Sequence, residues 1–169
     1  MNKFDFSDIP SYTIHSGWKC NISWGYLETH LKIMVDECGL NLDPDFQRAH
    51  VWDKEKQAKY VEYILRGGKS GRELYFNCIN WNSKVMGEHV CVDGKQRLEA
   101  VRPFLRNDLE VFSNGLLKNK NLLKYKDFTG KMRLTGLDFV WNVNDLKTRK
   151  EVLQWYLDLN EDGVVHTSE

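Results

Sequence analysis

Five consecutive residues near the middle of the chain combine side chains that can bind and process phosphate groups. Asp93, Gly94, Lys95, Gln96 and Arg97 follow a short apolar run and open onto a helical pattern, so a strand would deliver them to one strand-to-helix turn. A glycine lets backbone N–H groups approach an anion closely, and a helix N-terminus adds partial positive charge. Lys95 and Arg97 can neutralise phosphate, and Asp93 can bind a metal ion or orient a water molecule. A polar turn closed by a salt bridge fits the same spacing, so both interpretations stay open.

A second polar segment lies in a predicted loop just before a helix that Asp53 is expected to cap. It carries Gln47, Arg48 and Trp52, and Arg48 can clamp a phosphate. The alternative is that Arg48 forms a structural ion pair. For Phe46 and Trp52 we favour a role as core anchors, because large aromatic side chains chiefly supply buried area.

Apolar residues recur at helical spacing in four parts of the chain. Polar caps and glycines mark where several of these helices begin or end. The predicted helices are residues 23–37 between Ser23 as N-cap and Gly39, a helix from Asp53 to the Gly67-Gly68 stop, a helix from the Asp93–Arg97 turn to about Leu105, and a final helix capped by Asp145, with Tyr156 and Leu157 on or near its apolar face.

Short apolar and aromatic runs predict strands at 74–76, 89–92 and 137–141, and the residues up to Trp18 are irregular or strand-like. Helices outweigh strands. We therefore predict an α+β fold with a small sheet, and a single domain over residues 1–169.

Composition narrows the classes of function. Lysine plus arginine equal aspartate plus glutamate, at 24 each, which argues against coating nucleic acid by bulk charge. The four cysteines form no CxxC pair and suit a reducing cytoplasm. One of them, Cys91, is expected to be a small buried hydrophobe rather than a nucleophile. No membrane span or signal peptide is expected, so the predicted location is cytoplasmic.

A lysine-rich stretch interrupted by aromatic residues has the composition of a nucleic-acid contact face, although a solvated charged face is the commoner outcome. Its basic residues are the candidate DNA contacts. They are Lys118, Lys120, Lys124, Lys126, Lys131 and Arg133.

The two polar segments together resemble a known superfamily. The order is Pro44-Asp45-Phe46-Gln47-Arg48, then Val51-Trp52, a helix, Tyr75-Phe76, and Val92-Asp93-Gly94-Lys95-Gln96-Arg97-Leu98. This is similar to the ParB/sulfiredoxin-like superfamily, and most to its DGQQR-motif branch in GmrSD-type modification-dependent restriction systems. The resemblance covers residues 42–105 well, and Asn160-Glu161-Asp162-Gly163 resembles the later N-x-G-G turn more weakly. The chain looks like a short member of the kind that bacteriophages carry.

The resemblance implies a ParB/sulfiredoxin-like core with a small mixed sheet flanked by several helices. It also implies binding of a nucleoside triphosphate with Mg²⁺, with hydrolysis or phosphoryl transfer. The implied catalytic residues are Asp93, Gln96 and Arg97, with Asp93 at the metal, and the implied nucleotide-binding residues are Gln47, Arg48, Gly94 and Lys95. One departure is Lys95, which stands where the family usually has glutamine. The fused nuclease domain is not expected within this length, so DNA cleavage by this chain alone is not expected.

Three hypotheses follow. The leading one is a Mg²⁺-dependent nucleoside triphosphatase or phosphotransferase linked to DNA or to phage–host restriction, because such chemistry needs positioning and charge neutralisation more than a reactive side chain. The second is a non-catalytic nucleotide- or DNA-binding switch or inhibitor module. The third is a DNA-nicking nuclease that uses Asp43, Asp45 and Asp93. The base and the oligomeric state, including a homodimer, are left open.

Overall fold

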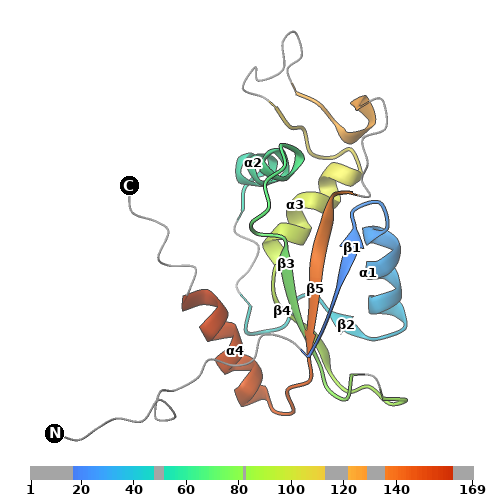
Figure 1. Ribbon diagram of the computed structural model, residues 1–169, viewed down its shortest axis with the longest axis vertical. Helices are drawn as coiled ribbons and strands as arrows, with labels where there is room; N and C mark the ends of the chain where they lie inside the picture. The colour runs from blue at the N-terminus through green and yellow to red at the C-terminus, as the bar shows by residue number, and fades with distance from the viewer. Residues whose placement is uncertain (1–16, 48–51, 82, 113–121, 129–135, 162–169) are drawn as a thin grey trace, which may run out of the picture.

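A computed structural model describes residues 17–47, 52–81, 83–112, 122–128 and 136–161 (Figure 1). These residues form a five-stranded mixed sheet with four α-helices, which confirms the predicted α+β class. The elements are β1 (Trp18–Ser23), α1 (Leu27–Asp36), β2 (Leu40–Asn41), α2 (Lys54–Leu65), β3 (Glu73–Cys78), β4 (His89–Asp93), α3 (Lys95–Leu105), the 3₁₀ turn η2 (Tyr125–Asp127), β5 (Asp138–Asn144) and α4 (Arg149–Glu161).

The strand order is β1-β5-β3-β4-β2. β5 pairs antiparallel with β1 and parallel with β3, while β4 pairs antiparallel with β3 and parallel with β2. A register shift between Tyr75 and Phe76 of β3 lies beside the end of β4, where Tyr75 is opposite Asp93. Bulges of this kind re-aim side chains at sheet ends, and this one lies next to the polar turn.

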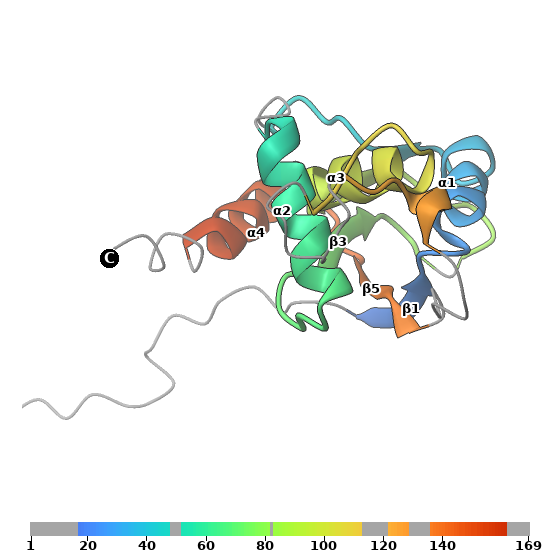
Figure 2. The same cartoon turned by 90° about the horizontal axis from the view of Figure 1, so that it is seen from above.

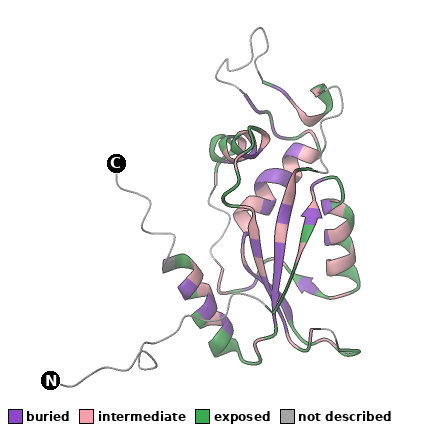
Figure 3. Cartoon of the chain, in the orientation of Figure 1, coloured by how far each residue is buried: buried purple, intermediate pink, exposed green. Residues whose placement is uncertain are grey.

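Alternation along the strands sends side chains to both faces of the sheet. On one face, Phe76, Cys91 and Trp141 join the large core that α1, α2 and α3 cover. On the other face, Val90 and Val92 of β4 pack with Val152 and Trp155 of α4 in a smaller cluster. Figures 1 and 2 show α2 beside α3, and in the view of Figure 1 α4 lies apart from both. Figure 3 shows buried residues on α4 as well as in the sheet.

The helix that follows β4 begins at a glycine for steric reasons. Gly94 is the N-cap of α3 with φ of 106°, a conformation that L side chains rarely adopt. A Cβ at this position would lie 2.4 Å from Leu74 Cδ2 and 3.2 Å from Leu74 Cα. The close packing of β3 against the turn therefore requires a glycine, in addition to any need of an approaching anion.

The second predicted helix has the expected boundaries. Asp53 is its N-cap, and its carboxylate accepts a hydrogen bond from the Lys56 N–H at 2.8 Å. At the other end the Gly67 and Gly68 N–H groups bond to the carbonyls of Ile64 and Tyr63. This pair of bonds is the Schellman arrangement that glycine favours at helix ends.

Two predicted helix starts were wrong. Ser23 is the last residue of β1 rather than an N-cap, and α1 begins after Tyr26, which makes no side-chain cap. Asp145 does not cap α4, because its carboxylate accepts from the Asn80 N–H and from Lys147. The N-cap contacts of α4 come instead from Thr148, which exchanges hydrogen bonds with Glu151, as in a capping box.

Candidate functional site

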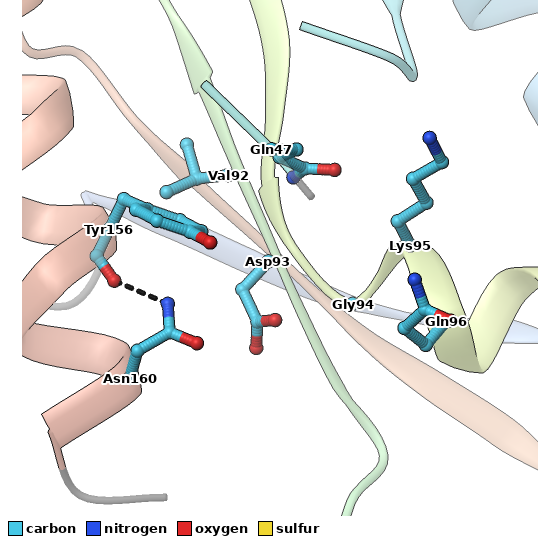
Figure 4. Close-up of a pocket in the computed structure, with 8 residues that line it drawn as sticks. All are labelled: Gln47, Val92, Asp93, Gly94, Lys95, Gln96, Tyr156 and Asn160. Atoms are coloured by element: carbon cyan, nitrogen blue, oxygen red, sulfur yellow. Dashed lines mark hydrogen bonds between the residues drawn. The ribbon is translucent and has the colours of Figure 1, made fainter. Parts of the chain in front are cut away.

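A pocket of ≈ 170 Å³ lies where β4 ends and α3 begins (Figure 4). Its walls come from three parts of the chain that are far apart in sequence: the loop before α2, the β4–α3 turn, and one face of α4. The lining residues are Gln47, Val92, Asp93, Gly94, Lys95, Gln96, Tyr156 and Asn160. The structure thus brings together five of the seven predicted site residues.

The first turn of α3 lacks the side chains that usually stabilise a helix N-terminus. Its N-cap, Gly94, has no side chain with which to cap the turn, whereas α2 is capped by Asp53 and carries Glu55 in its first turn. In α3 the first turn holds no acid and two cations, Lys95 and Arg97. Positive side chains oppose the helix dipole at an N-terminus, and a bound anion would reverse that cost.

Both cations of this turn are held by carboxylates. Lys95 pairs with Asp43 in the loop before α2, and Arg97 pairs with Asp93. The side chain of Lys95 is 15% exposed against 76% for Asp43, so the lysine is largely enclosed while its partner lies at the surface. In Figure 4 the Lys95 side chain extends away from the Asp93 carboxylate.

Gln47 ties the second segment to the first. Its Nε2 donates to the Cys91 carbonyl at 2.7 Å, which orients the amide because a carbonyl can only accept. Its Oε1 is buried and has no donor among the described residues. A few residues on, the Trp52 N–H donates to Gln96 Oε1 at 3.1 Å. Two hydrogen bonds therefore link the two predicted motifs side by side.

Three further residues singled out in the sequence are Arg97, Arg48 and Cys91. Arg97 does not line the pocket but pairs with Asp93, which does, and its Nε is buried without a partner among the described residues. Arg48 lies outside the described residues, so its role stays a prediction. Cys91 is fully buried, and burial raises the pKa of its thiol to about 12, which confirms a buried hydrophobe.

The aromatic expectations for the second segment are confirmed in part. Phe46 packs with the small cluster under α4, and its ring lies 5.7 Å from that of Tyr156. Trp52 is half-buried against the main core, with its ring 5.4 Å from that of Tyr60.

Two of the lysine-rich stretch's six basic residues are described. Lys124, the residue before the η2 turn, has its Nζ 3.7 Å from Glu110 Oε1, and Lys126 is the middle residue of that turn. Lys118, Lys120, Lys131 and Arg133 lie outside the described residues, as do residues 162 and 163 of the weak tail match. Contact with DNA and homodimer formation stay predictions.

Sequence reasoning missed the contribution of α4. Tyr156 was placed on or near an apolar face but lines the pocket, and Leu157 beside it is 52% exposed. Asn160 entered only through the tail resemblance, and it too lines the pocket. The available signal was their spacing, because residues four apart share one helix face.

The three carboxylates of the nuclease hypothesis each have a cation. Asp93 pairs with Arg97, Asp43 with Lys95, and Asp45 makes two hydrogen bonds of 2.8 and 2.9 Å with Arg149. Within the described ranges, no group of three or more His, Cys, Asp or Glu side chains could hold a metal ion. Those ranges also hold no helix that is long and apolar enough to cross a membrane.

Residues 32–164 match the family model of the GmrSD restriction endonuclease, N-terminal domain. The chain therefore belongs to this family, which implies a role in restriction and confirms the predicted ParB/sulfiredoxin-like DGQQR resemblance. Searches of curated proteins and of solved structures returned no match.

Proposed function

We propose that this domain binds the phosphate groups of a nucleoside triphosphate in the pocket at the start of α3 and hydrolyses the nucleotide or transfers its phosphate in the service of restriction. The observation that carries the proposal is the first turn of α3. It has no capping side chain and no acid, it holds Lys95 and Arg97, and it opens on a pocket with a carboxylate at its edge. A helix N-terminus of this kind favours phosphate.

In this proposal the backbone of the Gly94–Gln96 turn and the Lys95 ammonium hold the phosphates. Arg97 lies in the same first turn of α3. Arg97 also orients Asp93, because the two form an ion pair. Asp93 lies at the pocket edge and is 32% exposed, so it can receive a proton from an attacking hydroxyl or water, or orient that group. Such a site works mainly by positioning and charge neutralisation.

The residues fit Mg²⁺ in the way that phosphate-processing sites usually hold it. Mg²⁺ keeps several waters and is bound through one or two carboxylates together with substrate phosphates. Asp93 supplies one carboxylate in the pocket, and one of its oxygens is already shared with Arg97. The ion would neutralise charge on the phosphates, and Asp93 would be its protein ligand.

The direct test is release of phosphate by the purified chain from each of the four nucleoside triphosphates with Mg²⁺, with and without DNA. We expect release from at least one of them, and loss on the order of 10²-fold or more in Asp93→Asn. Asp138→Asn is the matched control, because Asp138 also pairs with an arginine, Arg72, at 3.0 Å but lies outside the pocket. Equal activity of wild type and Asp93→Asn would contradict the assigned role.

One observation favours a binding switch as the second candidate. Both cations of the turn are already neutralised, Lys95 by Asp43 and Arg97 by Asp93, so phosphate binding would have to exchange these partners. Exchange of ion pairs can move the loop that carries Asp43 without any chemistry. If nucleotide raises the melting temperature while no phosphate is released, the switch is supported and the enzyme is excluded.

A further inference from the structure

The α4 wall of the pocket presents a hydrogen-bond acceptor, whereas the α3 turn presents donors and positive charge. Tyr156 and Asn160 are one helical turn apart and both line the pocket. The side-chain amide of Asn160 donates to the Tyr156 carbonyl at 2.6 Å. This contact directs Nδ2 at the helix and leaves Oδ1 as the group that faces the cavity (Figure 4).

A second acceptor lies across the pocket from this wall. Gln47 Nε2 is committed to the Cys91 carbonyl, so Gln47 Oε1 is a buried acceptor without a donor among the described residues. Leaving such a group unsatisfied costs free energy. A fully ionised phosphate group has no hydrogen to donate, so it can satisfy the α3 turn but neither of the two amide oxygens.

The α4 wall is held firmly enough to act as a recognition surface. Trp155 is completely buried and meets Tyr75 of β3 edge-on, with ring centroids 5.8 Å apart. The neighbouring ring of Tyr156 packs against Phe46 at 5.7 Å. These contacts fix the helix against the sheet, so Tyr156 and Asn160 keep their place when the pocket fills.

We infer that the Tyr156–Asn160 face of α4, together with Gln47 Oε1, is a ribose subsite that makes the domain selective for ribonucleotides; this rests on the proposed binding of nucleotide phosphates at α3. Ribose hydroxyls are the donors closest to the phosphates of a nucleotide, and each can donate to one of the two amide oxygens. The Tyr156 ring offers an apolar surface for the sugar. The ≈ 170 Å³ between the walls is below the roughly 300–1,000 Å³ of pockets that enclose whole drug-sized ligands, so the base extends beyond it.

The test measures binding of each ribonucleoside triphosphate, its 2′-deoxy and 3′-deoxy counterparts, and inorganic tripolyphosphate by calorimetric titration with Mg²⁺. The wild-type chain is expected to bind the ribonucleotide about 3- to 10-fold more tightly than at least one deoxy form, the value of one neutral hydrogen bond. Asn160→Leu should abolish the preference over the deoxy form that lacks the hydroxyl paired with Asn160, and it should leave tripolyphosphate binding unchanged. Leu157→Ala, an exposed change on the same helix, is the control.

Two results separate failure of this inference from failure of the proposed function. If tripolyphosphate and all nucleotides bind with no ribose preference, or if Asn160→Leu retains every preference of the wild-type chain, the ribose subsite is wrong while phosphate binding at α3 stands. If none of these ligands binds the wild-type chain, the proposed function itself is contradicted, and the subsite with it.

Discussion

The turn from Gly94 to Arg97 and the loop from Asp43 to Gln47 meet at one pocket, but they are held in place by different forces. Gly94 packs directly on Leu74, and Leu98 just beyond the turn is buried in the main core. The loop is attached by one hydrogen bond from Gln47, by ion pairs from Asp43 and Asp45, and by the packing of Phe46 against the small cluster under α4. The turn is thus part of the main core, and the contacts that join the loop to the turn itself are polar.

This difference suggests a division of labour between the two sides. Packing fixes the first turn of α3 in a manner that salt does not change, because the interior is dense and apolar. Exposed ion pairs are each worth little and are screened by salt, so the loop can exchange its partners at modest cost. The α3 turn would then stay rigid, and the loop would exchange its ion-pair partners when the ligand binds.

The largest expected effect comes from filling the space between Gly94 and Leu74. Gly94→Ala combines a positive φ with overpacking and should lower the free energy of unfolding by roughly 2–5 kcal/mol. Gly39→Ala is the matched control, because Gly39 has φ of 62° with nothing within 4 Å of a new Cβ; it should cost roughly 1–2 kcal/mol. Urea denaturation measures both, and equal losses would show that the turn is not packed on the core.

The strand that delivers the turn should make the fold acid-sensitive. His89 is 1% exposed, and burial lowers the pKa of its imidazole from 6.5 to about 4. Between pH 6.5 and pH 4 the His89 imidazole is therefore protonated in the unfolded chain but neutral in the folded chain. Stability should be complete above pH 6.5 and fall by up to about 3 kcal/mol as the pH drops to 4.

His89→Leu should flatten this dependence in urea denaturation at pH 7 and pH 4.5. The neighbouring His30, whose pKa burial also lowers, is present in both proteins and cancels in the comparison. Identical changes in stability for the two proteins would contradict the assignment to His89.

A smaller effect is expected from the single hydrogen bond that docks the loop. Gln47→Leu removes the donor to the Cys91 carbonyl and should lower the free energy of unfolding by about 1 kcal/mol. Amide hydrogen exchange should rise in residues 43–47 and stay unchanged in α3. If exchange rises equally in both, the turn and the loop are one cooperative unit rather than two.

The smallest effect on stability is expected from the loop's surface charge. Asp45→Asn breaks the pair with Arg149, both of whose side chains are more than half exposed, and should change the free energy of unfolding by no more than about 1 kcal/mol. Its effect on nucleotide affinity should appear in low salt and vanish in high salt. Asp36→Asn, which removes the same charge from the exposed end of α1, is the control and should change neither.

Local signals predicted the parts of the fold that local chemistry decides. The cap at Asp53, the stop at Gly67 and Gly68, and the turn at Gly94 each follow from one residue's own conformation or side chain. The sequence did not predict β1 as a definite strand. It pairs with β5 through contacts such as Trp18 with Val143, which no short window of sequence contains.

The same reasoning explains what could be foreseen of the site. The turn and Gln47 were found because their side chains are chemically distinctive and close in sequence to other signals. Tyr156 was not found, because a tyrosine among apolar neighbours on a helix is indistinguishable from a core residue until the helix is packed. The steric need for Gly94 was likewise hidden, since it depends on Leu74 in another strand.

The central claim is that nucleotide phosphates bind at the first turn of α3, and a crystal structure with a nucleoside triphosphate and Mg²⁺ tests it most directly. The account predicts phosphate density against the backbone N–H groups of residues 94–96, with Lys95 turned from Asp43 toward the ligand and the metal beside Asp93. Phosphates bound elsewhere on the domain, with the Lys95–Asp43 pair intact, would contradict it.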